Sequence, residues 1–163
     1  MAQPKMTVPQ VMDQLRTTPV RLRGLAAGVP SETLRTPPAP DEWSPGEVLA
    51  HLRACSDKWG ECATRIIEED HPRLRATNPR IWITKTDYPD LEFAPSLRAF
   101  VRQRKALLAV LEGLEPDDWL RTGTLVGAGR PVELTAHSYA ERLARHERPH
   151  VKQMARAVAA LTS

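Results

Sequence analysis

Apolar residues recur every three or four positions in four long segments of this chain, and proline-rich connections separate the segments. In a helix this spacing forms one apolar stripe, which is stable only when it is buried against other helices. No internal repeat accompanies the pattern. The sequence therefore predicts an all-α fold, a four-helix bundle with long crossover connections. We expect the helices at residues 8–27, 45–70, 95–112 and 132–161.

The second of these segments has the clearest start signal in the chain. Ser44 is suited to be the N-cap, Pro45 takes the first helical position, and Glu47 completes a capping box. Trp43 and Val48 lie on either side of the cap and can pack together as a hydrophobic staple. These signals predict where the helix begins.

The remaining local expectations concern prolines and connections. Pro19 lies inside the first helix and should bend it, because proline removes a backbone donor. Residues 32–43 are too rich in proline for a helix. Residues 71–94 predict a long connection that shapes a pocket, in which only residues 81–84 (Ile-Trp-Ile-Thr) favour extended structure. Three glycines after Pro116 predict a short hairpin.

Length, composition and charge restrict the class of protein. The 163 residues, 41% hydrophobic and 26% charged, fit a single folded domain over 1–163. The 23 basic residues are spread among 20 acidic ones, which argues against a nucleic-acid partner. No apolar run approaches the ~20 residues that span a bilayer, and no secretory signal is visible. We therefore expect a cytoplasmic protein without a membrane partner.

The densest group of cations comprises Arg73, Arg75 and Arg80. Aromatic residues do not alternate with these arginines, as they often do in nucleic-acid sites. We interpret the stretch as a solvated loop, with a functional anion site as the alternative.

Three of the five histidines can meet at one site. His146 and His150 are four positions apart, so they project from one face of the last helix. His51 lies at the margin of the second helix's apolar stripe, where a facing helix can reach it. Three imidazoles with positions left for water are typical of a catalytic metal site. The alternative is that they are core histidines with ordinary hydrogen-bond partners. We expect His71 and His137 to lie outside the site.

Residues 146–150 also spell His-Glu-Arg-Pro-His, which matches the H-E-x-x-H motif of zinc proteases. Pro149 interrupts the motif and no further acidic or histidine ligand follows it, so we do not expect a protease. Glu147 can instead support a ligand or act as a base towards the metal's water. The alternative is a carboxylate at the core boundary that is paired with an arginine.

The two cysteines, Cys55 and Cys62, are seven positions apart on one predicted helix. That separation places their Cα atoms ~10 Å apart, beyond the ~7 Å that a disulfide bridges. We expect both to be reduced core residues. Because Cys55 follows His51 by one helical turn, a Cys-His pair is the alternative for this thiol.

Three stretches of the chain carry a family resemblance. They are LRTTPVRLRGLAAGVP (15–30), EWSPGEVLAHLRACSDKWG (42–60) and ERLARHERPHVKQM (141–154). With these stretches the chain resembles the DinB/YfiT-like superfamily of metal-binding four-helix bundles. The resemblance implies a divalent metal, nickel or zinc, held by His51, His146 and His150. The chain departs from the family's usual pattern at Pro149, which lies between two of these residues.

The resemblance also implies a range of functions. The first is an S-transferase that uses a low-molecular-weight thiol, which the metal would activate by lowering its pKa. The second is a metal-dependent hydrolase with a metal-activated water. A non-enzymatic, stress-related or ligand-binding bundle is a further alternative. The family further implies a small-molecule substrate and a homodimer.

Overall fold

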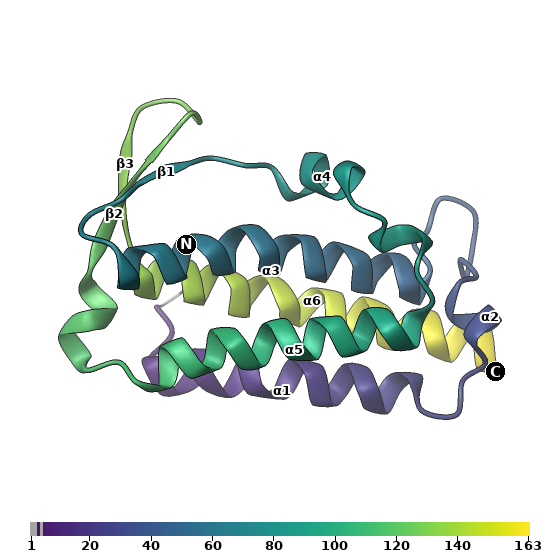
Figure 1. The fold of residues 1–163 in the computed structure, drawn as a ribbon. Helices are drawn as coiled ribbons and strands as arrows, with labels where there is room; N and C mark the ends of the chain where they lie inside the picture. The colour runs from purple at the N-terminus through teal and green to yellow at the C-terminus, as the bar shows by residue number, and fades with distance from the viewer. Residues whose placement is uncertain (1–2, 4) are drawn as a thin grey trace.

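Four long helices packed side by side form the body of the molecule (Figure 1). The computed structural model describes residues 3 and 5–163. The helices are α1 (Val8–Ala26), α3 (Pro45–Glu68), α5 (Phe93–Glu112) and α6 (Ala136–Thr162). The prediction of an all-α four-helix bundle is confirmed. The expected extent of the domain, 1–163, stays a prediction, and residues 1, 2 and 4 lie outside the described residues.

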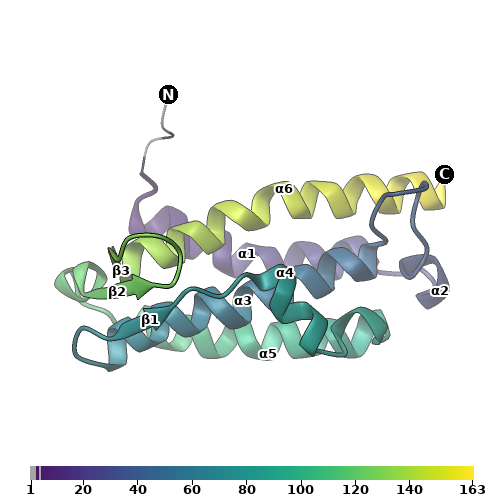
Figure 2. The same cartoon turned by 90° about the horizontal axis from the view of Figure 1, so that it is seen from above.

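The packing order of the helices decides which side chains can meet. α3 packs against α5 and α6, and α1 packs against the same two helices. Seen from above, α3 and α6 run side by side along the length of the bundle (Figure 2). Among the described residues, no helix is both long enough and apolar enough to cross a membrane.

Reciprocal caps determine where α1, α3 and α6 begin. The Ser44 hydroxyl accepts a hydrogen bond from the Glu47 backbone N–H at 3.1 Å, and the Glu47 carboxylate accepts one from the Ser44 N–H at 2.7 Å. The same arrangement at Thr135 starts α6 at Ala136. The expected start at residue 132 was therefore wrong, because residues 132–135 form a strand whose last residue, Thr135, is the cap of α6.

Short helices in the connections correct two further expectations. Residues 32–43 were expected to be free of helix, yet α2 (Ser31–Leu34) supplies one turn there. Residues 81–84 were expected to be extended, yet they lie in α4 (Pro79–Trp82) and a 3-10 turn, η1 (Ile83–Lys85). Asn78 explains the second case, because its side chain caps α4 by accepting from the Arg80 N–H at 2.9 Å. Two more 3-10 turns, η2 and η3, span Tyr88–Asp90 and Pro116–Leu120.

A small three-stranded sheet covers one end of the bundle. β2 (Thr122–Val126) and β3 (Val132–Thr135) form the predicted hairpin, and β1 (Arg73–Arg75) pairs with β2 in parallel. The sequence did not predict β1, because three residues are too few to show an alternating pattern. A Cβ at position 123 would lie 3.0 Å from both Ile66 Cγ1 and the Pro72 carbonyl oxygen, so Gly123 lets the sheet approach α3.

The α3–α5 connection, which contains β1, α4 and both of the turns η1 and η2, runs along α3 (Figures 1 and 2). Asp57 on α3 anchors its second half. The Asp57 carboxylate accepts hydrogen bonds from Trp82 Nε1 at 2.9 Å and from the Tyr88 hydroxyl at 2.7 Å. The connection is therefore attached to the body of the protein by β1 at one end and by Asp57 at the other.

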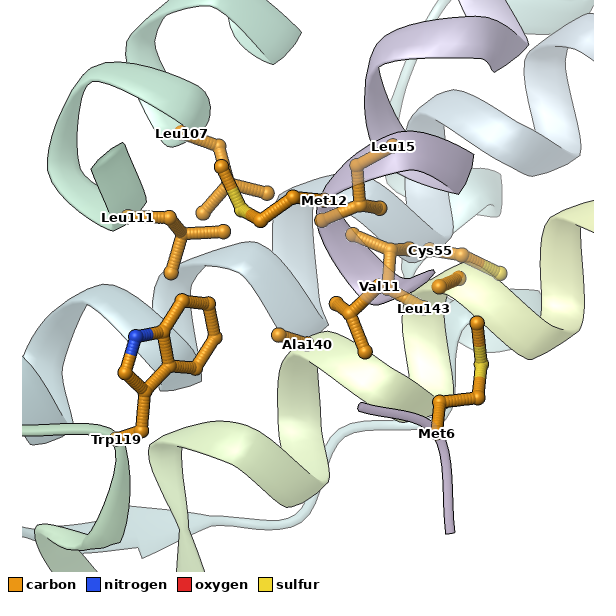
Figure 3. Packing of buried hydrophobic residues seen from close by; sticks show 11 residues of the cluster. Met6, Val11, Met12, Leu15, Cys55, Leu107, Leu111, Trp119, Ala140 and Leu143 are labelled. Atoms are coloured by element: carbon orange, nitrogen blue, oxygen red, sulfur yellow. The ribbon is translucent and has the colours of Figure 1, made fainter. Parts of the chain in front are cut away.

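Apolar side chains from all four long helices fill the core. Figure 3 shows one end of it, where the indole of Trp119 packs near the leucines of α5 and the apolar residues of α1. Cys55 belongs to this cluster, as expected of a core thiol. The buried members of the cluster are Met6, Val11, Met12, Leu15, Cys55, Leu107, Leu111, Trp119, Ala140, Leu143 and Ala144.

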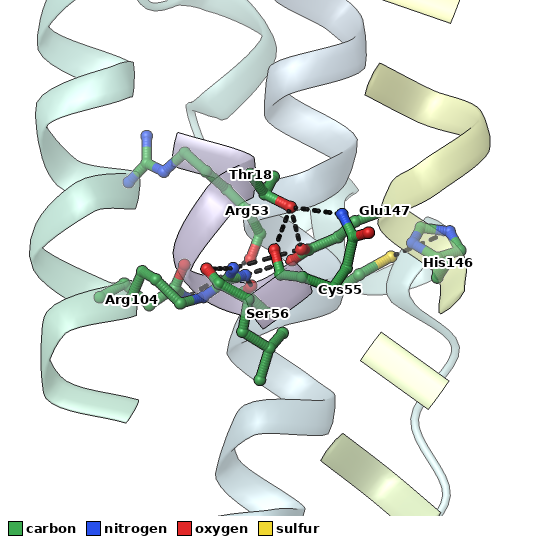
Figure 4. A network of polar contacts seen from close by, with 10 residues as sticks. Thr18, Arg53, Cys55, Ser56, Arg104, His146 and Glu147 are labelled. Atoms are coloured by element: carbon green, nitrogen blue, oxygen red, sulfur yellow. Dashed lines mark hydrogen bonds and ion pairs between the residues drawn. The ribbon is translucent and has the colours of Figure 1, made fainter. Parts of the chain in front are cut away.

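An arginine–glutamate ion pair lies in the middle of the bundle (Figure 4). The side chains of Arg104 on α5 and Glu147 on α6 are 2% and 0% exposed. Arg104 also donates to the Leu15 carbonyl oxygen at 2.8 Å and to the Ser56 hydroxyl at 3.2 Å. The Thr18 hydroxyl donates to Glu147 Oε2 at 2.6 Å. One network thus connects α1, α3, α5 and α6.

Removing one member of this pair should destabilise the protein strongly. We expect Arg104→Met to lower the free energy of unfolding by about 3–5 kcal/mol, because Glu147 then stays buried without its counter-charge. Urea denaturation measures this loss. Arg102→Met, on an exposed position of the same helix, is the matched control and should stay within about 0.5 kcal/mol of the wild type.

The double variant Arg104→Met/Glu147→Gln separates charge from packing. It should recover part of the lost stability, because no uncompensated charge remains in the core. A loss that is the same in the single and the double variant would contradict the role assigned to the ion pair.

Candidate metal centre

The packing of α3 against α6 brings the three predicted histidines together. His51 Nε2 lies 3.0 Å from His146 Nε2, and His150 Nε2 lies 3.1 Å from the same atom. His146 and His150 share one face of α6, which remains a single helix through Pro149. The imidazole rings of His51 and His150 are 4.7 Å apart between centroids. The spacing expected from the sequence therefore corresponds to a real cluster.

Hydrogen bonds alone do not account for this cluster. A ring nitrogen has one in-plane site, which holds either a proton or a lone pair. His146 Nε2 faces two other Nε2 atoms at 3.0 and 3.1 Å, so one proton cannot serve both contacts. A cation placed among the nitrogens satisfies all three lone pairs. Two ligand nitrogens of a tetrahedral zinc ion lie about 3.3 Å apart, close to the distances seen here.

Cys55 brings a sulfur to the same place. Its Sγ atom lies 3.7 Å from His51 Nε2. The same atom lies 3.8 Å from His146 Nε2, and Figure 4 shows this second contact. A thiolate and an imidazole on one zinc ion are about 3.6 Å apart, so these distances also fit a ligand. The donor atoms of His51, Cys55 and His146 all lie within 4.8 Å of one another. Two overlapping ligand sets thus exist, which share His51 and His146 and differ in His150 or Cys55.

Burial keeps the imidazoles of His51 and His146 neutral. Desolvation, followed by the charge of His150, lowers the pKa of His51 to about 4 and that of His146 to about 3. Neutral imidazole is the form that binds metals. Burial and then the carboxylate of Glu147 raise the pKa of Cys55 to about 12, so its thiol keeps its proton near neutral pH.

Two indoles and one amide hold the histidines in place. The Trp43 ring is stacked on His150 at 6.2 Å between centroids, and the Trp59 ring meets His146 edge-on at 4.9 Å. Gln153 Oε1 lies 2.8 Å from His150 Nδ1 and accepts its proton, which leaves Nε2 of that ring with a free lone pair. Sequence reasoning assigned Trp43 only to the helix staple and missed the other two residues. The i,i+3 spacing of His150 and Gln153 was the available signal.

Glu147 does not reach the site. Its carboxylate points into the core towards Arg104 and Thr18, whereas the His146 ring points away from them (Figure 4). The base role considered for Glu147 is therefore wrong. The pairing with an arginine is confirmed, although it is fully buried rather than at the boundary.

His71 and His137 lie apart from the cluster, as expected. His71 is exposed and contacts the hydroxyls of Thr122 and Thr124 at 3.0 and 2.9 Å. His137 is buried, and its Nε2 donates to the Met6 carbonyl oxygen at 2.9 Å. Both therefore have structural partners of their own.

A cavity of about 920 Å³ opens beside the histidines. Its walls come from α3, from α6, from the end of β2 and from residues 75–81 of the α3–α5 connection. His51, His146, His150 and Cys55 all contribute to its lining. The connection thus shapes a pocket, as expected, and the candidate ligands are open to small molecules from that side.

Comparisons with known proteins concern the family and the fold of this chain. The profile of the DinB superfamily matches residues 14–154. A protein of Geobacillus thermodenitrificans (strain NG80-2), named a candidate metal-dependent hydrolase, is 27% identical over 126 residues, which are 74% of this chain and 67% of that protein. YfiT from Bacillus subtilis, described as a probable metal-dependent hydrolase with an unusual four-helix bundle topology, superimposes with a TM-score of 0.76. That match is 16% identical and covers 96% of this chain and 91% of YfiT, so it concerns the fold alone.

The lowered histidine pKa values predict how stability depends on pH. In metal-free protein, the unfolded chain binds protons at His51 and His146 near pH 6.5, whereas the native state binds them only near about 4 and about 3. The free energy of unfolding should therefore fall as the pH drops from about 6.5 towards 4, because the unfolded state takes up more protons. Urea denaturation of chelator-treated protein at several pH values measures this slope.

Two histidine variants provide the comparison. His146→Asn should reduce the slope, whereas His71→Asn, at an exposed position away from the cluster, should keep it. A slope that is unchanged in His146→Asn would mean that this imidazole is not held neutral in the native protein.

Proposed function

The chain belongs to the DinB superfamily, and on that premise we propose that it is a metal-dependent enzyme. The proposed metal, nickel or zinc, is held by His51, His146 and His150. The observation that supports this most is the convergence of Nε2 atoms at 3.0 and 3.1 Å, which no arrangement of ring protons satisfies. Three imidazole nitrogen donors suit both metals.

The residues around the histidines prepare the site for its ligand. Gln153 keeps the His150 proton on Nδ1, and the indoles of Trp43 and Trp59 restrict how the rings can turn. A divalent metal at such a site lowers the pKa of a thiol or a water that binds to it, so a nucleophile is available near neutral pH. The cavity beside the histidines gives that nucleophile and its partner room to meet.

We favour transfer onto a low-molecular-weight thiol over hydrolysis. The cavity, about 920 Å³, is at the upper end of the range for small-molecule sites and has space for a thiol and an electrophile together. Glu147, which would serve as the base for water in an H-E-x-x-H enzyme, is engaged by Arg104. The names of the two relatives support the hydrolase alternative. An open cavity at the cluster argues against a purely structural bundle.

Other expectations accompany this proposal. A small-molecule substrate, a homodimer and a cytoplasmic location remain predictions. The His51–His146–His150 set also remains a proposal, because Cys55 offers a second set with two of the same histidines.

The metal content of untagged protein tests the proposal first. We expect about one nickel or zinc ion per chain by plasma mass spectrometry, and its loss in His146→Ala, because a site with fewer nitrogen donors binds more weakly. His71→Ala, which changes a histidine outside the cluster, should retain the metal. Protein that takes up no metal even after reconstitution would overturn the enzyme proposal.

Turnover then distinguishes the two reactions. A transferase should consume a reactive aryl halide only when a thiol is present, whereas a hydrolase should cleave esters with water alone. His51→Ala, His146→Ala and His150→Ala should each abolish either activity. Full activity in any of these three variants would contradict both readings.

The two ligand sets are separated by one pair of variants. We expect His150→Ala to lose the metal and Cys55→Ser to keep it, because His150 Nε2 already carries a lone pair whereas the Cys55 thiol must first lose a proton. Cobalt absorption adds a second readout, since a sulfur ligand produces an intense charge-transfer band. Cys62→Ser is the matched control, because Cys62 lines the same cavity. The converse result would place Cys55 on the metal and favour a structural centre.

A further inference from the structure

The cavity beside the histidines has a strongly basic wall. Five cationic side chains line it, against the single carboxylate of Glu61. The cations come from α3, from α6 and from the α3–α5 connection. They are Lys58, Arg65, Arg75, Arg80 and Arg142.

Acidic neighbours already occupy two of these cations. The Arg65 guanidinium contacts both carboxylate oxygens of Glu69, at 2.6 and 3.1 Å, and Lys58 Nζ lies 3.5 Å from Glu61 Oε2. Among the described residues, neither Arg80 nor Arg142 forms an ion pair. These two guanidinium groups are therefore available to a ligand.

Arg80 and Arg142 are each placed next to the histidine cluster by an indole. The Arg142 guanidinium lies 4.6 Å from the centre of the Trp59 ring, which meets His146 edge-on. The Arg80 guanidinium lies 5.7 Å from the Trp43 ring, which is stacked on His150. Cation–π contacts of this kind restrict exposed arginines.

We propose that the substrate or thiol bound in this cavity carries an oxyanion group, a carboxylate or a phosphate, that binds to Arg80 and Arg142. This inference rests on the proposed function and specifies the class of molecule that the site accepts. A guanidinium presents paired N–H donors that match the oxygens of either anion. Cations on a concave wall also attract anions from solution more strongly than cations on a flat surface.

The position of Arg80 bears on the interpretation of the basic stretch that comprises Arg73, Arg75 and Arg80. Arg75 and Arg80 line the cavity, whereas Arg73 does not contribute to its lining. The structure thus favours the anion-site alternative over a solvated loop for the residues that face the cavity. The spacing of these residues in the sequence did not reveal that the connection runs along α3 and contributes to the cavity wall.

Binding of simple anions to metal-free protein tests the inference without reference to turnover. Malonate and inorganic phosphate are titrated at low salt, with malonamide as the neutral isostere of malonate, and binding is followed by calorimetry and by NMR shifts. We expect saturable binding of at least one anion and none of malonamide. Binding of malonate alone assigns a carboxylate, and binding of phosphate alone assigns a phosphate.

The decisive variant is Arg80→Gln/Arg142→Gln. Its affinity for the bound anion should fall at least about tenfold, because two charge-assisted contacts are lost. The control Arg98→Gln/Arg102→Gln removes the same charge from exposed positions of α5 outside the cavity and should bind as the wild type does. Unchanged affinity in the first variant, equal binding of malonamide, or no saturable binding up to about 10 mM would overturn the inference.

Metal content keeps this test separate from the proposed function. Arg80→Gln/Arg142→Gln should still hold about one metal per chain, because neither arginine is among the proposed ligands. If anions bind as expected but no metal does, the enzyme proposal fails while the anion site stands. If metal binds and anions do not, only the anion site fails.

Discussion

The buried ion pair of Arg104 and Glu147 is the constraint on which the arrangement of the bundle depends. Removing both charges from water is costly, and their mutual attraction together with further hydrogen bonds offsets that cost. Here the partners come from all four long helices. Because consecutive residues on a helix differ by about 100°, a core-facing Glu147 turns His146 towards the cavity. The ion pair therefore sets the rotation of α6 that aims the histidines.

Much of the fold could be predicted from local patterns, because helices are determined by contacts within a few residues. The start of α3 was predicted by its capping residues, Ser44, Pro45 and Glu47. The apolar stripes predicted the positions of the other long helices. The sheet was harder to foresee. β1 is short and pairs with a strand about fifty residues away, so the signal for it is non-local.

Part of the candidate site could also be predicted, because the spacing of residues within one helix is a local pattern. The pair His146 and His150 follows from helical spacing, and the position of His51 at the margin of the apolar stripe of α3 placed it within reach of a facing helix. Trp59, Arg80 and Arg142 could not be found in this way, because their relation to the histidines depends on how α6 and the α3–α5 connection lie against α3. A motif such as H-E-x-x-H reveals which residues share a face and leaves open which face meets the core.

The α3–α5 connection contributes to the cavity wall, whereas the long helices carry the proposed metal ligands. β1 holds one end and Asp57 holds Trp82 and Tyr88, whereas the residues between them, 76–81, contribute to the cavity wall and include Arg80. The proposed metal ligands all lie on the long helices instead. Substitutions between the attachments can therefore change which molecules are admitted while the ligand geometry is preserved. Related chains can therefore differ in the molecules that they bind while they keep the same metal ligands.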